Sequence, residues 1–265
     1  MDRTVGAELG ITAYGECQLE LQIAVARTPG LEVTEKLSIM YGDREIVPVE
    51  VAMPHDGRLH LVTLPPGYSQ VHYEAHVSGD AVIPEPSQAD LSLYLRPSRY
   101  IESESFGGFA QSEFAGVSGA ELLEAVSSWV GTRLSYVPGS SGPTDGATQT
   151  LLGGAGVCRD YAHLVIALLR ALRVPARLAA VYAPGCDPMD FHAVVEAFVE
   201  GGWYAVDATA LAPRSSLVRI ATGRDAADTA FLTTIGGFVG LTSLTVTAVA
   251  DELPDDDVTR LVRLR

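Results

Sequence analysis

The sequence predicts an α+β fold, in which an all-β N-terminal domain precedes a domain with one buried helix against an antiparallel sheet. Three observations predict it. Short alternating segments separated by turn residues fill residues 10–79, an apolar helix spans 156–173, and strand-like segments follow that helix. The chain has 265 residues, of which 47% are hydrophobic, so it can bury a sizeable core.

The N-terminal domain is predicted as a small β-sandwich over residues 1–82. Segments with alternating or β-branched residues span 17–26, 44–53, 58–64 and 70–77. Turn signals such as Pro29-Gly30 and Pro66-Gly67 separate these segments at spacings that suit a sandwich.

A crossover is predicted over residues 83–117. It contains prolines, and its apolar and aromatic residues indicate that it packs on the surface of the protein. The second domain is predicted over 118–265. Helical periodicity begins near Ser118, and a loop rich in Gly, Ser, Pro and Thr spans 138–148.

The helix predicted over 156–173 is apolar on nearly its whole circumference. A narrow polar stripe along it includes Arg159, His163 and Arg170. Such a helix is expected to run through the middle of its domain, and Pro175 ends it. Four strands are then predicted, at residues 176–183, 191–199, 203–208 and 242–250.

Charge and cysteine content limit the possible functions. The 18 Lys and Arg residues against 33 Asp and Glu give a net charge of −15, and no stretch is strongly basic, so nucleic-acid binding is not expected. The three cysteines, an odd number in a chain of this length, do not form a disulfide framework. No leader-like start or membrane-spanning segment is found, and a cytoplasmic protein without membrane contact is expected.

Cys158 is the candidate nucleophile. It follows the glycine-rich segment 153–157 and lies in the first turn of the predicted buried helix. Free backbone N–H groups and the positive end of the helix dipole stabilise an anion there, so the thiol is expected to ionise more readily. The same N–H groups can bind the oxyanion of an acyl-transfer reaction. A lone cysteine is more often a small buried hydrophobic residue, so this position alone does not identify a nucleophile.

The segments 191–199 and 203–208 are so close in sequence that they predict a β-hairpin. If Glu200 and Gly201 form the turn, paired residue numbers sum to 401, and His192 and Asp207 become diagonal neighbours on one face. A turn one residue later leaves the two side chains on one face but too far apart, and a three-residue loop puts them on opposite faces. The first register predicts a histidine base oriented by a carboxylate. A histidine alone on such a strand is more often a core residue.

Three motifs then resemble a known family. GVCRDYAHL at 156–164, DFHAVVEAF at 190–198 and GWYAVDAT at 202–209 are similar, in order, to the core motifs of transglutaminase-like proteins. YLRPSRY at 94–100 and GRDAADTAFLTT at 223–234 resemble a bacterial subgroup of this superfamily, with cysteine proteases and acyltransferases that often have a β-rich N-terminal region.

The resemblance implies a papain-like α+β core, with Cys158 as the nucleophile, His192 as the base and Asp207 as the orienting acid. One departure is Val194, where many relatives have tryptophan. This departure concerns the shape of the pocket for the acyl group.

Other chemistry is less well supported by the sequence. A metal site is not expected, because no CxxC pair occurs and His163 lies five positions after Cys158. His163 is predicted as an exposed or capped residue, and Glu196 as structural. Cys186 is the rival nucleophile, but no helix start follows it. No cofactor is expected.

The predicted function is therefore that of a cysteine-nucleophile enzyme acting on amide bonds through a thioester. Hydrolysis by a protease or amidase is favoured, because water needs no dedicated second site. The alternatives are a transglutaminase-type acyltransferase and a non-catalytic interaction module. The expected substrate is a protein, a peptide or a small amide. The second oxyanion donor stays open between Gln149 and Tyr136, and the sequence does not predict the oligomeric state.

Overall fold

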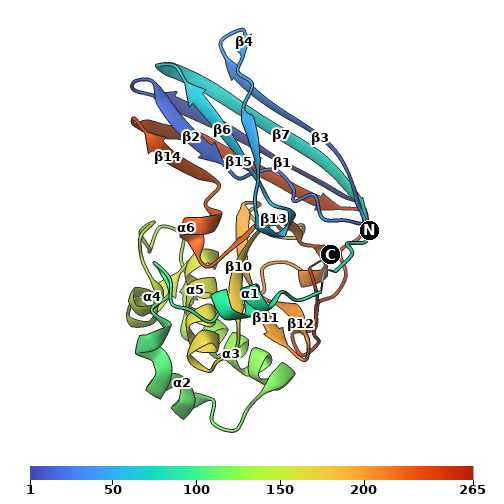
Figure 1. The fold of residues 1–265 in the computed structure, drawn as a ribbon, viewed down its shortest axis with the longest axis vertical. Coiled ribbons are helices and arrows are strands. Elements are labelled where there is room, and N and C mark those ends of the chain that lie inside the picture. The colour runs from blue at the N-terminus through green and yellow to red at the C-terminus, as the bar shows by residue number, and fades with distance from the viewer. Residues whose placement is uncertain (84, 265) are drawn as a thin grey trace.

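The computed structural model describes residues 1–83 and 85–264 (Figure 1). Pro84 of the predicted crossover and Arg265 at the end of the predicted second domain lie outside the described residues. Long strands fill the upper half of Figure 1, and helices surround a smaller sheet in the lower half. The α+β class predicted from the sequence is confirmed.

Two antiparallel sheets form the strand-rich half. The first has the order β15 (Val239–Ala250), β1 (Arg3–Ala13), β7 (Gly67–Gly79), β3 (Leu31–Tyr41), β4 (Arg44–Glu45). The second has the order β14 (Leu232–Gly236), β2 (Cys17–Leu21), β6 (Arg58–Leu64), β5 (Val49–Ala52). Alternate residues of β7 are buried, as expected for a strand with one face on a core, and both sheets contribute to one hydrophobic cluster.

The strands β14 and β15 come from the end of the chain but pair inside this half. β15 pairs antiparallel with β1, and β14 pairs with β2. The predicted division into 1–82, 83–117 and 118–265 therefore differs from the sheets for β14 and β15, which belong to the predicted second domain but pair with strands of the first. Strand character in 242–250 was visible in the sequence, whereas its partner more than 200 residues away was not. β1 also begins at Arg3, ahead of the predicted strand region.

The lower half contains a four-stranded antiparallel sheet with helices around it. Its strand order is β12 (Gly202–Val206), β11 (Phe191–Val199), β10 (Ala176–Tyr182), β13 (Val218–Gly223). The helices are α1 (Gln88–Leu93), α2 (Gly107–Glu113), α3 (Gly119–Arg133), α4 (Ala147–Gly153), α5 (Cys158–Ala171) and α6 (Ala226–Thr229). The short strands β8 (Ser135–Tyr136) and β9 (Ala155–Gly156) pair in parallel just before α5.

Helix α5 is the buried helix that the sequence predicts. All residues from Asp160 to Arg170 are buried. Arg170 is only 2% exposed, and its guanidinium donates to the backbone oxygens of Arg96, Ala176 and Arg224. One buried cation thereby joins α5 to the crossover and to the end of β13, because its donors must be satisfied inside the protein.

The hairpin of β11 and β12 has the first of the registers weighed from the sequence. Val195 pairs with Val206 and Val199 pairs with Gly202, so the paired numbers sum to 401. Glu200 and Gly201 form the turn with φ values of 50° and 78°, as a two-residue hairpin turn requires. The predicted register is confirmed.

The two halves share hydrophobic packing. Tyr182 at the end of β10 donates a 2.7 Å hydrogen bond to the Ile23 backbone oxygen and contacts the ring of Tyr73 from β7. Val218 and Ile220 of β13 belong to the same buried cluster as the sandwich residues. A continuous core of this kind favours a fixed orientation of the two halves.

A glycine in α3 gives a test of how tightly this helix packs against the segment after β12. An added Cβ at Gly131 would lie 2.7 Å from the backbone oxygen of Ala208, the residue after Asp207. Alanine normally stabilises a helix interior relative to glycine by about 1 kcal/mol, but here we expect Gly131→Ala to lower the free energy of unfolding by about 1 to 3 kcal/mol through overpacking. The matched control is Gly153→Ala in α4, also at an exposed helical glycine, where an added Cβ meets nothing within 4 Å. Urea unfolding of both variants measures this, and equal effects of the two would contradict the steric explanation.

Candidate active site

Cys158 is the first residue of α5, and its side chain is half-buried. The chain reaches it directly from β9, whose Gly156 packs against the first turn of the helix. An added Cβ at Gly156 would lie 2.6 Å from the Asp160 Cβ, so a glycine is needed for this close approach. The sulfur therefore lies at the N-terminal end of the helix, as predicted, among backbone N–H groups that favour negative charge.

Asp160 introduces a negative charge beside this helix start. It is fully buried and accepts hydrogen bonds from the Val157 N–H at 2.8 Å and the Ser141 hydroxyl at 2.5 Å. Arg159 donates to it at 3.1 Å and also to the Gly142 oxygen at 2.9 Å. These contacts offset the charge of Asp160 and hold the loop 138–146 against the start of α5.

His192 and Asp207 meet across the β11–β12 hairpin. His192 Nε2 donates to Asp207 Oδ2 at 2.7 Å, and each side chain is 2% exposed. Asp207 Oδ1 accepts from the Thr209 backbone N–H at 2.9 Å and from the Thr209 hydroxyl at 2.6 Å. Both carboxylate oxygens are thus occupied, which fixes the carboxylate and leaves Nδ1 as the imidazole atom not bonded to it.

The electrostatics of this pair favour the charged forms. Burial disfavours an imidazolium, but the Asp207 carboxylate outweighs burial and raises the pKa of His192 well above its ordinary value. The nearby Cys158 side chain acts in the same direction. Burial likewise raises the pKa of Asp207, but His192 and the two Thr209 donors outweigh it and hold that pKa below its ordinary value.

Cys158 and His192 line one cleft of about 560 Å³. Its other lining residues are Gln22, Tyr100, Pro143, Val157, Arg159, Leu178, Ala180, Asp190, Phe191, Ala193, Ile220, Ala226, Ala227, Thr229, Ala230, Phe231, Leu232, Thr233 and Leu244. Asp207 lies behind His192 and is not part of the lining. The sequence did not predict that sandwich residues such as Gln22 and Leu244 reach this cleft, and its only signal was the family-like segment 223–234.

The rival residues lie in other environments. Cys186 is 7% exposed, and burial raises the pKa of its thiol, which makes it a poorer nucleophile. His163 is fully buried, so the prediction of an exposed side chain is wrong; its Nε2 accepts the Ala226 N–H at 3.1 Å. Helix α5 is buried on all sides from Asp160 to Arg170, so the polar residues His163 and Arg170 are buried as well. Burial lowers the pKa of His163 to about 4, which keeps it a neutral acceptor.

Glu196 occupies the same face of β11 as His192 but joins a different network. It accepts hydrogen bonds from Arg177 on β10 at 2.9 Å and from Arg219 on β13 at 2.6 and 2.7 Å. Burial raises its pKa, yet the two guanidiniums outweigh burial and hold that pKa far below its ordinary value. Among residues 1–83 and 85–264, no group of three or more His, Cys, Asp or Glu side chains is arranged to hold a metal ion.

The two candidate oxyanion donors differ in their surroundings. The Gln149 side-chain oxygen accepts the Gly146 N–H at the start of its own helix, α4. Tyr136 lies in β8, paired with Gly156 two residues before Cys158. Burial and the Cys158 side chain raise the pKa of the Tyr136 hydroxyl, so it keeps its proton and can donate.

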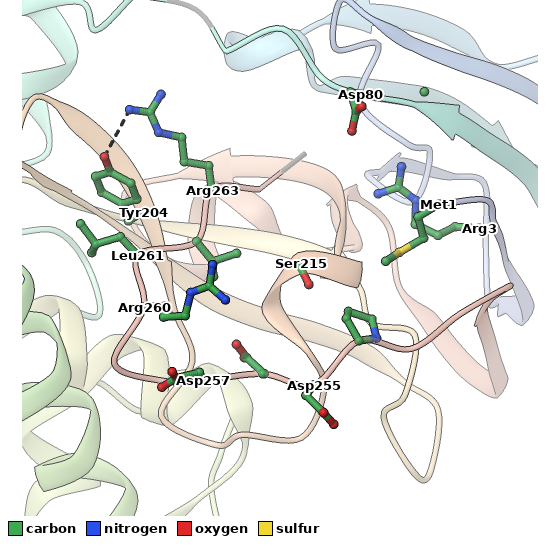
Figure 2. A pocket seen from close by; sticks show the side chains of 14 residues that line it. Met1, Arg3, Asp80, Tyr204, Ser215, Asp255, Asp257, Arg260, Leu261 and Arg263 are labelled. Atoms are coloured by element: carbon green, nitrogen blue, oxygen red, sulfur yellow. Dashed lines mark hydrogen bonds between the residues drawn. The ribbon is translucent and has the colours of Figure 1, made fainter.

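A second hollow of about 540 Å³ lies where the two chain ends meet (Figure 2). Figure 2 shows Arg3, Asp80 and Met1 on one side and Asp255, Asp257 and Arg260 facing them from the C-terminal segment. None of Cys158, His192 and Asp207 lines it. The cleft at the start of α5 is therefore the candidate active site.

Comparison with known proteins supports the family resemblance for the middle part of the chain. Residues 113–208 match the model of the transglutaminase-like superfamily, which confirms the resemblance predicted from the motifs. An uncharacterized protein from Mycobacterium leprae is 31% identical over 135 residues, which are 48% of this chain and 48% of that protein. The matched part is thus about half of that relative's length.

Some solved protein structures are also similar to this chain. A proposed cysteine protease from Cytophaga hutchinsonii has 28% identity and a TM-score of 0.89, with 96% of this chain and 92% of that chain covered. The periplasmic domain of TgpA from Pseudomonas aeruginosa has 20% identity and a TM-score of 0.41, covering 77% of this chain and 90% of that chain. The first of these structures shows the same fold over nearly the whole chain.

Within the described part of the chain, every helix is too short or too polar to cross a membrane. The cytoplasmic location expected from the sequence stays a prediction.

The buried His192–Asp207 pair predicts a defined pH dependence of stability. The pKa of His192 is higher in the folded than in the unfolded protein. Its protonation therefore stabilises the folded state in full at pH values below the unfolded-state pKa, and this stabilisation is lost as pH rises through the folded-state pKa. The pKa of Asp207 is lower in the folded than in the unfolded protein. Its ionisation therefore stabilises the folded state in full at pH values above the unfolded-state pKa, and this stabilisation is lost as pH falls through the folded-state pKa. At about pH 5 to 6 we expect Asp207→Asn to lower the free energy of unfolding by about 3 to 5 kcal/mol, because one partner of a buried pair is lost.

Urea unfolding across pH measures this difference, which should shrink towards both acid and alkaline pH. The matched control is Asp43→Asn, an exposed carboxylate in the turn between β3 and β4, for which we expect a change within about 0.5 kcal/mol. A deficit in Asp207→Asn that stays constant with pH would show that ionic pairing is not its cause.

Proposed function

We propose that this chain is a cysteine-nucleophile enzyme that cleaves amide bonds, because residues 113–208 match the model of the transglutaminase-like superfamily. The proposed nucleophile is Cys158, the base is His192 and the orienting acid is Asp207. The observation that supports this most directly is the 2.7 Å His192–Asp207 hydrogen bond beside a cleft that Cys158 also lines.

In the proposed mechanism His192 holds the proton of the Cys158 thiol, and the sulfur attacks the carbonyl carbon of an amide. The carbonyl oxygen becomes an oxyanion near the free N–H groups at the start of α5. His192 then gives the proton to the departing amine, and the C–N bond breaks. A thioester on Cys158 remains, and a water molecule activated by His192 hydrolyses it.

Tyr136 is our candidate for the second oxyanion donor. Its position on β8 beside β9 supports this role, since only Val157 separates β9 from Cys158 and the Cys158 side chain raises the pKa of the Tyr136 hydroxyl. Gln149 is less suitable, because the hydrogen bond from the Gly146 N–H to its side-chain oxygen holds its amide group at the start of α4.

Hydrolysis is favoured over transfer to an amine. The solved structure from Cytophaga hutchinsonii, which is 28% identical and matches this chain over 92% of its own length, is described as a proposed cysteine protease. Water also needs no dedicated binding site, whereas an acceptor amine does. A protein or peptide substrate follows from this proposal.

Alkylation of Cys158 tests the nucleophile. We expect iodoacetamide to modify Cys158 at pH 6 at least about tenfold faster than a free thiol of ordinary pKa, because the imidazolium and the helix start stabilise the thiolate. Peptide mapping by mass spectrometry gives the rate at each cysteine. Cys17 and Cys186 are both buried and serve as internal controls.

His192→Gln should remove this acceleration while the fold is retained, as monitored by circular dichroism. An unchanged rate in His192→Gln, or a wild-type rate no faster than that of the ordinary thiol, would rule out the proposed thiolate–imidazolium pair.

The fate of the acyl-enzyme separates the two reactions. We expect the thioester formed from an activated peptide ester to be released to water at a rate that added amines change by less than about twofold, because no second site for an amine is proposed. Stopped-flow measurement with increasing glycinamide or cadaverine gives the partition. Amine products that form in proportion to amine concentration and dominate over the acid would identify an acyltransferase.

A further inference from the structure

The cleft at Cys158 is built by both halves of the protein. Phe191 and Ala193 of β11 and Leu178 of β10 line it from the core sheet. Leu232 and Thr233 of β14, together with Gln22 and Leu244, line it from the sandwich. The ring of Phe231 stacks on that of Phe191, with centroids 5.0 Å apart and planes 25° apart. An aromatic contact therefore joins the two walls next to His192.

The interior of this cleft is mainly apolar. Its only charged lining residues among those described are Arg159, Asp190 and, when protonated, His192. The guanidinium of Arg159 is bonded to Ser141, Gly142 and Asp160, so it is held towards the loop 138–146. A ligand with a charged side chain would find no free partner of opposite sign deep in the cleft, whereas an apolar side chain would be removed from water.

The sandwich wall is the edge of a sheet. β14 is the last strand of its sheet and pairs with β2 on one side. Leu232 and Thr233 are consecutive residues of β14 and both line the cleft, as do Ala230 and Phe231 just before the strand. Successive side chains of a strand point to opposite faces, so a strand that lines a cleft with one face would contribute only every second residue. The free backbone edge of this segment therefore borders the cleft, and a sheet edge is a site where an extended peptide can pair.

We propose that the cleft binds an extended peptide along the segment 230–233, with an apolar side chain next to the attacked carbonyl, against the stacked rings of Phe191 and Phe231. The attack on the carbonyl rests on the proposed function, whereas the binding of the peptide does not. This inference gives the sandwich a role in substrate recognition and distinguishes the substrate from a glutamine carboxamide, whose polar side chain would lose its hydrogen bonds to water in this cleft.

The test measures binding to the unreactive variant Cys158→Ala. The probes are fluorescein-labelled hexapeptides of alanine and glycine with one variable residue, which is Leu, Phe, Gln or Lys. By fluorescence polarisation we expect the Leu and Phe peptides to bind at least about tenfold more tightly than the Gln and Lys peptides. N-acetyl-leucinamide should compete at least about tenfold more weakly than the unlabelled Leu peptide, because it cannot pair along the strand edge.

Two further variants, each in the Cys158→Ala background, test the wall itself. Phe231→Ala removes the stacked ring, and Ala227→Trp adds bulk at an exposed cleft position of α6. Each should reduce the preference for Leu over Gln by at least about fivefold. The control is Ile235→Ala in β14. Ile235 is exposed and does not line the cleft, so this variant should leave the preference unchanged.

Equal affinity for all peptides, a preference for Gln or Lys, or no binding of any peptide would overturn this inference. A preference that survives both Phe231→Ala and Ala227→Trp, or equal competition by N-acetyl-leucinamide, would overturn the role of the sandwich wall. Because binding is measured without Cys158, these outcomes are independent of the alkylation experiment. An inert Cys158 with a clear Leu preference would reject the proposed reaction and leave the peptide site in place.

Discussion

The hydrogen bond between His192 and Asp207 depends on the register of the β11–β12 hairpin. Both side chains are buried, and a charged group without a partner at such a depth is strongly destabilising. The register is set locally by Glu200 and Gly201, whose positive φ values form the tight turn. A slip by one residue would turn Asp207 to the other face and leave His192 alone. The turn and the His192–Asp207 pair therefore stabilise each other, since both require the same register of β11 and β12.

A second buried network holds the same sheet. Glu196 lies on the face of β11 that carries His192, and its two arginine partners come from β10 and β13, so three neighbouring strands are joined. Arg177 also packs over the ring of Trp203 on β12, with its guanidinium carbon 4.2 Å from the ring centre. The desolvation of these charges is offset by several short hydrogen bonds, and this geometry resists shear between the strands. The backbone that positions His192 is fixed as a consequence.

The sequence predicted best what is decided by local spacing. The β-hairpin, the buried helix with Cys158 in its first turn and the strand at 191–199 follow from neighbouring residues, and the structure has them, with the first of the three registers that were weighed. Long-range partners were beyond such reasoning. The pairing of β15 with β1 joins residues such as Arg3 and Ala250, and nothing in either segment names the other. The burial of His163 was missed for a related reason, because its partner, the Ala226 N–H at the start of α6, lies 63 residues further along the chain.

The return of the chain to the sandwich explains why the cleft has two walls. After β13, at the edge of the core sheet, α6 leads within a few residues into β14, at the edge of a sandwich sheet. Cap contacts fix this passage: Asp225 accepts the Ala227 N–H, and His163 of α5 accepts the Ala226 N–H. The segment that crosses between the halves is thereby tied to the helix that begins at Cys158. Since the halves also share a buried core, the sandwich wall stands at a fixed distance from the proposed nucleophile, and the cleft is preformed without a domain movement.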